Sequence, residues 1–87
     1  MLPAQQIFSR DFDDAYFRLP TSVRQRIQRK IDEISIRLTS YSHERLQGCA
    51  EFRFRIGDYR VTYSFEIAAN VIHLLRVGHR REIYRSL

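Results

Sequence analysis

The clearest pattern in the chain is the alternation of apolar and polar residues between positions 51 and 66. Successive residues of a strand point to opposite faces of a sheet, so one face would carry Phe52, Phe54, Ile56, Tyr59, Val61, Tyr63 and Phe65. The other face would carry Arg53, Arg55, Arg60, Thr62 and Ser64. Gly57 and Asp58 lie between the two runs, and glycine tolerates the positive φ of tight turns. The pattern predicts a β-hairpin with one apolar and one arginine-rich face.

Two stretches before this hairpin have the apolar spacing of helices. In residues 11–19 the apolar positions are Phe12, Ala15, Tyr16 and Leu19, and three aspartates crowd the first turn, where the helix dipole favours negative charge. A longer helix should start at Ser22, with Gln25 as its capping-box partner. Its apolar stripe is Val23, Ile27, Ile31, Ile34 and Leu38. We expect both helices to cover the apolar face of the hairpin.

The remaining segments complete a single α+β domain over residues 1–87. Residues 4–9 form a weak first strand, and 39–50 read as a polar connection. The segment 68–70 forms a turn, and 71–77 is apolar enough for a central strand that Gly78 ends. The tail should be short and irregular or helical. The predicted order is strand-helix-helix-strand-strand-strand, in a mostly antiparallel sheet with two helices on one face.

The charge of the chain suggests an acidic partner. The net charge is +5, and the basic residues are 14 arginines and one lysine, Lys30. Guanidinium groups bind phosphate in a planar, bidentate manner, so the partner would be nucleic acid or a negatively charged protein; plain solubility is the alternative. Cys49 is the single cysteine, so an internal disulfide is excluded and a packing role is expected. Without a recognisable signal peptide or membrane span, the cytoplasm is the expected location.

Candidate chemistry gathers on the open face of the predicted sheet. That face would collect Arg53, Arg55, Arg60 and Arg76, and the tail would add His79, Arg80, Arg81 and Tyr84. Together they could bind a phosphodiester, with Tyr84 stacking on a base. The alternative is a solvated face whose arginines pair with Glu51, Glu66 and Glu82. The histidines lack metal-ligand spacing, so we expect no metal and no cofactor, and any catalysis would use acid–base chemistry with electrostatic stabilisation.

Three short motifs carry a resemblance to a known family. They are the L-x-G of Leu46–Gly48, the R-x-G-x-Y-R that ends at Arg60, and the V-G-H-R that ends at Arg80, with Tyr84 behind it. Over about residues 5–85 the chain resembles the RelE/ParE superfamily of type II toxin–antitoxin toxins, nearer RelE. The resemblance implies a microbial-ribonuclease-like sheet. It also implies an mRNA endonuclease (an mRNA interferase) that works on the ribosome, inhibits translation and is neutralised by a cognate antitoxin.

The resemblance also implies roles for individual residues. Arg55, Arg60, Arg80 and Tyr84 match catalytic positions of RelE, whereas Arg53 stands where RelE has lysine, and an arginine hardly acts as a base. Related toxins typified by YoeB use a carboxylate base and a C-terminal histidine acid, which implies Glu44 and His79 here. From their place on the open face and in the tail, the expected RNA-binding residues are Arg53, Arg76 and Arg81. The implied reaction is attack of the RNA 2′-OH on the adjacent phosphate.

Two other functions fit the same sequence. A ParE-type toxin would inhibit DNA gyrase by protein–protein contact and would have no nuclease activity. A non-catalytic RNA- or ribosome-binding module would result if arginine has replaced the base and Glu44 points away from the arginines. The arginine set with Tyr84 favours the nuclease, because a gyrase inhibitor has no need of a phosphate site.

Overall fold

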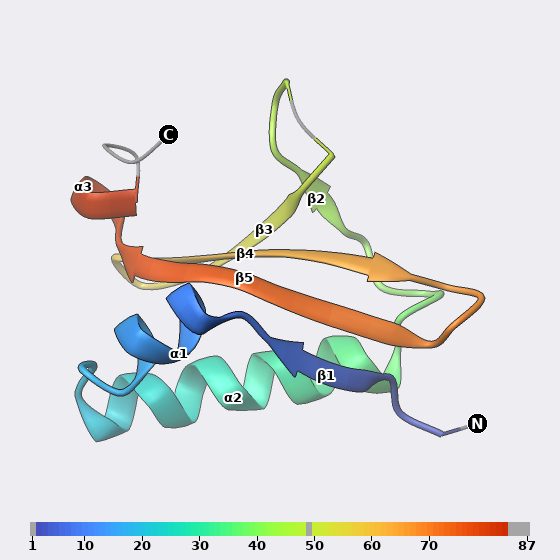
Figure 1. Cartoon of the computed structure of the whole chain (residues 1–87), viewed down its shortest axis with the longest axis horizontal. Helices are drawn as coiled ribbons and strands as arrows, with labels where there is room; N and C mark the ends of the chain where they lie inside the picture. Colours follow the sequence, from blue (N-terminus) through green and yellow to red (C-terminus); the bar gives the residue numbers. More distant parts are fainter. Residues whose placement is uncertain (1, 49, 84–87) are drawn as a thin grey trace.

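The computed structural model describes residues 2–48 and 50–83 as one curved sheet with helices on both sides. The elements are β1 (Gln5–Phe8), α1 (Arg10–Tyr16), α2 (Thr21–Ile36), β2 (Glu44–Arg45), β3 (Phe52–Ile56), β4 (Tyr59–Glu66), β5 (Val71–His79) and α3 (Arg80–Ile83). The sheet has five strands in the order β1-β5-β4-β3-β2. Only the β1–β5 pair among these is parallel. Figure 1 shows α1 and α2 on one side of the sheet and α3 on the other, so the predicted α+β fold is confirmed.

The hairpin forms as its alternation predicts. In β3 and β4, Arg55 lies opposite Arg60 and Phe54 lies opposite Val61, and the chain turns at Gly57 with a φ of 57°. Residues directly opposite each other point to the same face. The arginines therefore share one face of the sheet, and the apolar residues share the other.

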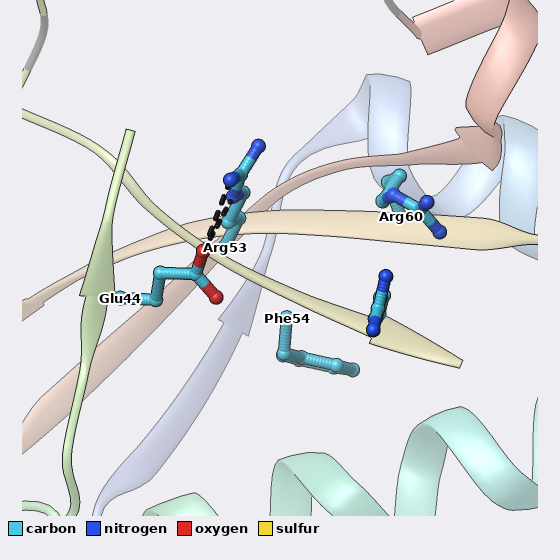
Figure 2. A pocket seen from close by; sticks show the side chains of 5 residues that line it. Glu44, Arg53, Phe54 and Arg60 are labelled. Carbon is cyan, nitrogen blue, oxygen red and sulfur yellow. Dashed lines mark hydrogen bonds and ion pairs between the residues drawn. The ribbon is translucent and has the colours of Figure 1, made fainter. Parts of the chain in front are cut away.

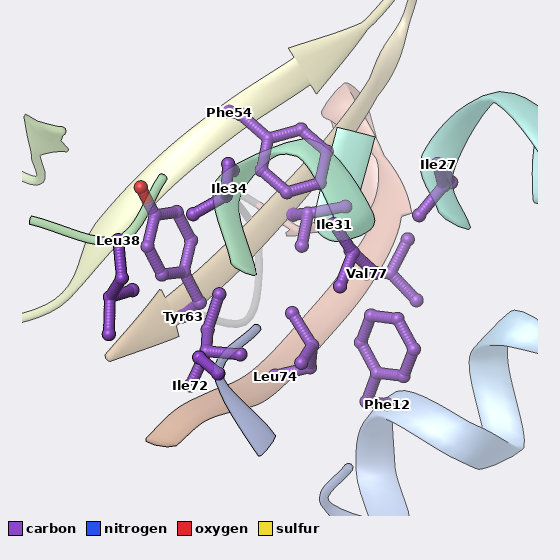
Figure 3. Close-up of a cluster of buried hydrophobic side chains, with 12 residues drawn as sticks. Phe12, Ile27, Ile31, Ile34, Leu38, Phe54, Tyr63, Ile72, Leu74 and Val77 are labelled. Carbon is purple, nitrogen blue, oxygen red and sulfur yellow. The ribbon is translucent and has the colours of Figure 1, made fainter. Parts of the chain in front are cut away.

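The apolar face of the hairpin is buried under α2. Ile27, Ile31 and Ile34 of this helix are fully buried, and they belong to one cluster with Val61 and Tyr63 of β4. Figure 3 shows the helix residues facing Phe54, Tyr63 and Val77 across the core, with Phe12 of α1 at one end. The predicted stripe on α2 is thus the core contact of the helix layer.

The two helices begin differently from each other. Ser9 caps α1, because its hydroxyl accepts a hydrogen bond from the Phe12 amide at 3.0 Å and donates one to the Leu75 carbonyl at 2.6 Å. The predicted capping box of α2 is wrong. The helix starts at Thr21 behind Pro20, which makes no side-chain capping bond, so Ser22 already lies inside the first turn.

Two boundaries of the predicted sheet are also wrong. The polar connection contains β2, whose two residues pair with β3, and such a short polar edge strand has no apolar periodicity to reveal it. Gly78 does not end the last strand, because β5 continues to His79 and Gly78 lies opposite Arg60. Glycine inside a strand often marks a place where another backbone or a ligand approaches closely.

A β-bulge in β5 changes which side chains reach each face. Thr62 pairs with Arg76 but Tyr63 pairs with Leu74, so Leu75 is an extra residue in the ladder. An extra residue reverses the alternation of the strand beyond it. Arg76 is thereby placed on the face of Thr62, away from the helices.

None of the helices within the described ranges is long and apolar enough to cross a membrane.

The core of α2 allows a direct test of the helix-on-sheet packing. Ile31→Ala should lower the free energy of unfolding by about 2–5 kcal/mol, because Ile31 is 0% exposed and its loss leaves a cavity. Chemical denaturation followed by circular dichroism measures the change. Ile36→Ala is the matched control, since Ile36 lies on the same helix at 65% exposure and its loss should change stability by less than about 0.5 kcal/mol. Equal effects of the two substitutions would contradict this packing.

Candidate functional site

The open face of the sheet is organised in rows of residues that lie opposite one another. One row runs from Arg55 on β3 through Arg60 on β4 to Gly78 on β5. The next row runs across four strands: Glu44, Arg53, Thr62 and Arg76. Neighbours within such a row have Cβ atoms about 4.5–5.5 Å apart, so the sheet brings together arginines that are distant in the sequence.

A hollow of about 270 Å³ lies where these rows meet the short edge strand β2. Its lining residues are Glu44, Arg53, Phe54, Arg55 and Arg60. Figure 2 shows Arg53 and Phe54 on opposite sides of β3, with the Glu44 carboxylate reaching Arg53 from β2. The hollow is large enough for a phosphate group, and most of its lining is cationic.

Glu44 and Arg53 form an ion pair across the edge of the sheet. Arg53 donates from Nη2 at 3.0 Å and from Nε at 3.2 Å, and both bonds go to the same carboxylate oxygen, Oε1. For the other oxygen, Oε2, the described part of the chain supplies no hydrogen bond. The carboxylate is therefore held in place by one oxygen, and the second can accept a proton.

Arg55 and Arg60 have a different environment. Arg60 donates from Nη1 to the Gly57 carbonyl at 2.9 Å and to the Tyr59 carbonyl at 3.4 Å, which folds it over the turn of the hairpin. Arg55 is exposed, and neither arginine pairs with a carboxylate among the residues that the structure describes. Like charges directly opposite each other destabilise a sheet, so this pair is an arrangement that an anion would stabilise.

Comparison with known families identifies the class of the protein. Residues 6–84 match the family model described as ParE toxin of the type II toxin–antitoxin system parDE. The chain is a toxin of the RelE/ParE superfamily. No curated protein matches the sequence significantly.

Solved structures similar to the toxin are RelE proteins of low sequence identity. The isolated E. coli RelE toxin is 17% identical, with a TM-score of 0.75 over 97% of this chain and 99% of that one. A chain of the RelB–RelE antitoxin–toxin complex from Methanococcus jannaschii is 24% identical. Its TM-score is 0.74, over 93% of this chain and 98% of that one. The toxin–antitoxin complex RelBE2 from Mycobacterium tuberculosis contains a chain that is 23% identical. Its TM-score is 0.72, over 92% of this chain and 94% of that one. At these identities the likeness establishes the fold.

The tail residues of the toxin do not all reach the arginine face. His79 lies opposite Tyr59, on the helix side of the sheet, and lines a separate hollow with Leu19 and Pro20. The bulge in β5 is the physical reason, because it reverses the alternation before His79. The expectation that His79 joins the arginines as an acid therefore does not fit this geometry.

Arg80 and Arg81 begin α3 at the end of β5. The Arg80 amide donates to the Asp58 carbonyl at 2.7 Å, and its Nε lies 3.9 Å from the Asp58 carboxylate. This places Arg80 beside the β3–β4 turn, at the same end of the sheet as Arg60. Arg81 is exposed, and its amide donates to His79 Nδ1 at 3.3 Å. Cys49 and Tyr84, with the packing and stacking roles expected for them, lie outside the described residues.

One residue that positions the site has no signal in the sequence. His43 precedes Glu44 and is held at Nδ1 by the Tyr63 hydroxyl at 2.6 Å and at Nε2 by the Leu38 carbonyl at 2.8 Å. Its ring also stacks on Phe65 with centroids 4.1 Å apart. Because a carbonyl only accepts, Nε2 donates to Leu38 and Nδ1 accepts from Tyr63 in neutral His43. Two hydrogen bonds and an aromatic contact thus fix the start of β2.

The third histidine, His73, contacts a carboxylate away from the hollow. Its Nε2 lies 2.8 Å from the Glu66 carboxylate, near the opposite end of β4. Glu66 thus contacts a histidine and pairs with none of the arginines that the structure describes. Across the described ranges, no three His, Cys, Asp or Glu side chains gather as metal ligands do.

The buried Tyr63 predicts a specific dependence of stability on pH. Burial raises the pKa of Tyr63 above its usual value of 10.0, because the phenolate would lose its hydration. Above pH 10 the unfolded chain loses this proton while the folded toxin keeps it, so the free energy of unfolding should fall as pH rises. Tyr63→Phe should remove this part of the decline, as denaturation at pH 9 to 11 would measure. A decline unchanged in Tyr63→Phe would show that Tyr63 is not its source.

Proposed function

We propose that this toxin is an endoribonuclease that cleaves mRNA on the ribosome and so inhibits translation. The observation that carries the proposal is the pair Arg55 and Arg60, opposite each other and without a carboxylate partner in the described chain, beside a hollow that contains Glu44. Two guanidinium groups at one point of a sheet favour a dianionic ligand. A phosphodiester passing through its pentacovalent transition state is such a ligand.

The proposed reaction is an intramolecular phosphoryl transfer. Glu44 takes the proton of the ribose 2′-OH on Oε2, while Arg53 holds Oε1. The 2′ oxygen then forms a bond to the adjacent phosphorus, and the bond from phosphorus to the 5′ oxygen breaks. The products are a 2′,3′-cyclic phosphate and a 5′-OH. Arg55 and Arg60 stabilise the additional negative charge on the phosphoryl oxygens during this transfer.

The leaving group needs a positive charge at the turn end of the sheet. Arg80 supplies it in this proposal, since it lies beside Asp58 and the hairpin turn that also holds Arg60. Arginine retains its proton, so Arg80 stabilises the leaving oxygen while water protonates it. The hydroxide left by that water takes the proton held on Glu44, which returns to its carboxylate form. His79 has no part in this mechanism, because its side chain lies on the helix side.

A cognate antitoxin is the proposed protein partner. RelE proteins of the same fold have been crystallised in complex with RelB antitoxins. The net charge of +5 supports a partner that presents acidic groups to the arginine face. Ribosome and mRNA are the proposed targets of the toxin when the antitoxin is absent.

Inhibition of DNA gyrase is the second candidate function. The family model that matches this chain describes a ParE toxin, and that match favours it. A gyrase supercoiling assay beside primer extension on a ribosome-bound message separates the two functions. Inhibited supercoiling with an intact message would overturn the nuclease proposal.

Arg60→Ala tests the proposed transition-state contact. We expect the rate of mRNA cleavage to fall about 10²–10³-fold, because one preorganised donor to the phosphoryl group is lost. Primer extension on ribosome-bound mRNA measures the rate, and growth arrest gives a second readout. Arg37→Ala is the control, since Arg37 lies beyond α2 and pairs with Glu33. Full cleavage by Arg60→Ala would remove Arg60 from the mechanism.

Glu44→Gln tests the proposed base. The amide keeps the shape of the side chain and can still accept a bond from Arg53, but it cannot take the 2′-OH proton. Cleavage should slow by about 10²–10⁴-fold, while binding to the ribosome stays within twofold. Glu33→Gln, on an exposed face of α2, should leave cleavage unchanged. If Glu44→Gln cleaves at the normal rate, another group is the base.

A further inference from the structure

Thr62 and Arg76 form a second polar position on the arginine face, next to the proposed cleavage site. They lie opposite each other on β4 and β5. The bulge at Leu75 turns Arg76 to this face, and without it the alternation from Leu74 would have put Arg76 under the helices. Bulges commonly re-aim a side chain beside a functional site.

Both residues hold a buried polar atom that the protein leaves without a partner. These atoms are Thr62 Oγ1 and Arg76 Nη1, neither of which has a hydrogen bond in the described part of the chain. Thr62 is only 3% exposed. Buried polar atoms of proteins nearly always find a partner in the chain, in water or in a ligand. An acceptor for both a guanidinium and a hydroxyl, either water or a ligand, would satisfy this pair.

The charges around this pair favour an anion. Arg76 makes no ion pair among the described residues, and the neighbouring Arg53 is already bound to Glu44. Glu66, on the same strand as Thr62, pairs with His73. Arg76 therefore pairs with no described carboxylate, and an anionic ligand would neutralise its charge.

The position of the pair relative to Arg60 matches a polynucleotide backbone. Arg76 is two residues before Gly78, the partner of Arg60, and such diagonal neighbours lie about 7–8 Å apart. This distance is close to the spacing of consecutive phosphates in an extended RNA strand.

We propose that Thr62 and Arg76 form a second phosphate subsite, which binds the phosphate next to the one that is cut. The RNA then lies along β4, with the scissile phosphate at Arg55 and Arg60 and its neighbour at Thr62 and Arg76. This inference rests on the proposed function and extends it, because it assigns the line on the sheet along which the RNA strand lies. The subsite selects for a substrate with at least two consecutive phosphates.

The test pairs protein variants with RNA in which one phosphate is neutral. Short single-stranded RNA with 2′-O-methyl riboses cannot be cut, and a methylphosphonate placed at each position in turn removes one charge. Fluorescence anisotropy measures the affinity of each oligonucleotide for the wild type and for Arg76→Met. Arg37→Met is the matched control, since it removes the same charge from the exposed C-terminal end of α2, where Arg37 pairs with Glu33.

The subsite predicts one RNA position at which the effects of a methylphosphonate and of Arg76→Met on the binding free energy are not additive. A methylphosphonate there should weaken binding to the wild type about tenfold and should have no further effect on Arg76→Met. Arg76→Met should also reduce the slope of log affinity against log salt by about 0.7, the value for one phosphate of a single strand. Thr62→Val, which keeps the shape of the side chain, should weaken binding at the same position. Circular dichroism of each variant checks that it is folded.

The outcomes distinguish this inference from the proposed function. If Arg76→Met and Arg37→Met bind alike at every position while Arg60→Met binds weakly, the second subsite is overturned and the cleavage site remains. If the wild type neither binds RNA nor cleaves mRNA on the ribosome, both proposals are overturned. The subsite is supported if a methylphosphonate weakens binding to the wild type at one position and if this effect disappears only in the Thr62 and Arg76 variants.

Discussion

The burial of one face of the β3–β4 hairpin under α2 is the constraint on which the rest of the structure depends. Val61 and Tyr63 are fully buried against the helix layer. Because strand residues alternate, this burial commits Arg60 and Thr62 to the opposite face. The same hydrophobic contact that stabilises the toxin therefore also builds its cationic surface. A slip of one residue in the register would place arginines in the core, so register and site are specified together.

The charges on the cationic surface are not equivalent. Arg53 is held by Glu44, and Arg80 lies near Asp58, whereas Arg55 and Arg60 face each other without such a partner in the described ranges. Opposed like charges lower the stability of the free toxin. An anion bound at this point would relieve the repulsion, and both of the proposed partners, RNA and an acidic antitoxin, offer one.

The position of Glu44 depends on contacts that lie outside the arginine face. β2 has only two residues and pairs only with β3 among the described strands, which is a weak attachment by itself. The preceding residue, His43, is anchored to Tyr63 and Leu38 inside the aromatic part of the core. Burial also raises the pKa of the Tyr63 hydroxyl, so this group remains a donor to His43 even above pH 10. The core thus positions a carboxylate at the rim of the hollow.

The sequence alone determined the hairpin, the two helices that cover it and the face on which Arg53, Arg55 and Arg60 lie. These features follow from local periodicity, which a short stretch of chain already contains. Two features depended on pairing between distant strands: the edge strand that carries Glu44, and the bulge that sends His79 to the helix side. Arg76 lies on the open face as expected, but the bulge is what puts it there. No local pattern encodes a bulge or a two-residue edge strand, because each exists only once its neighbour in the sheet is in place. Tertiary structure therefore decided which charged residues meet.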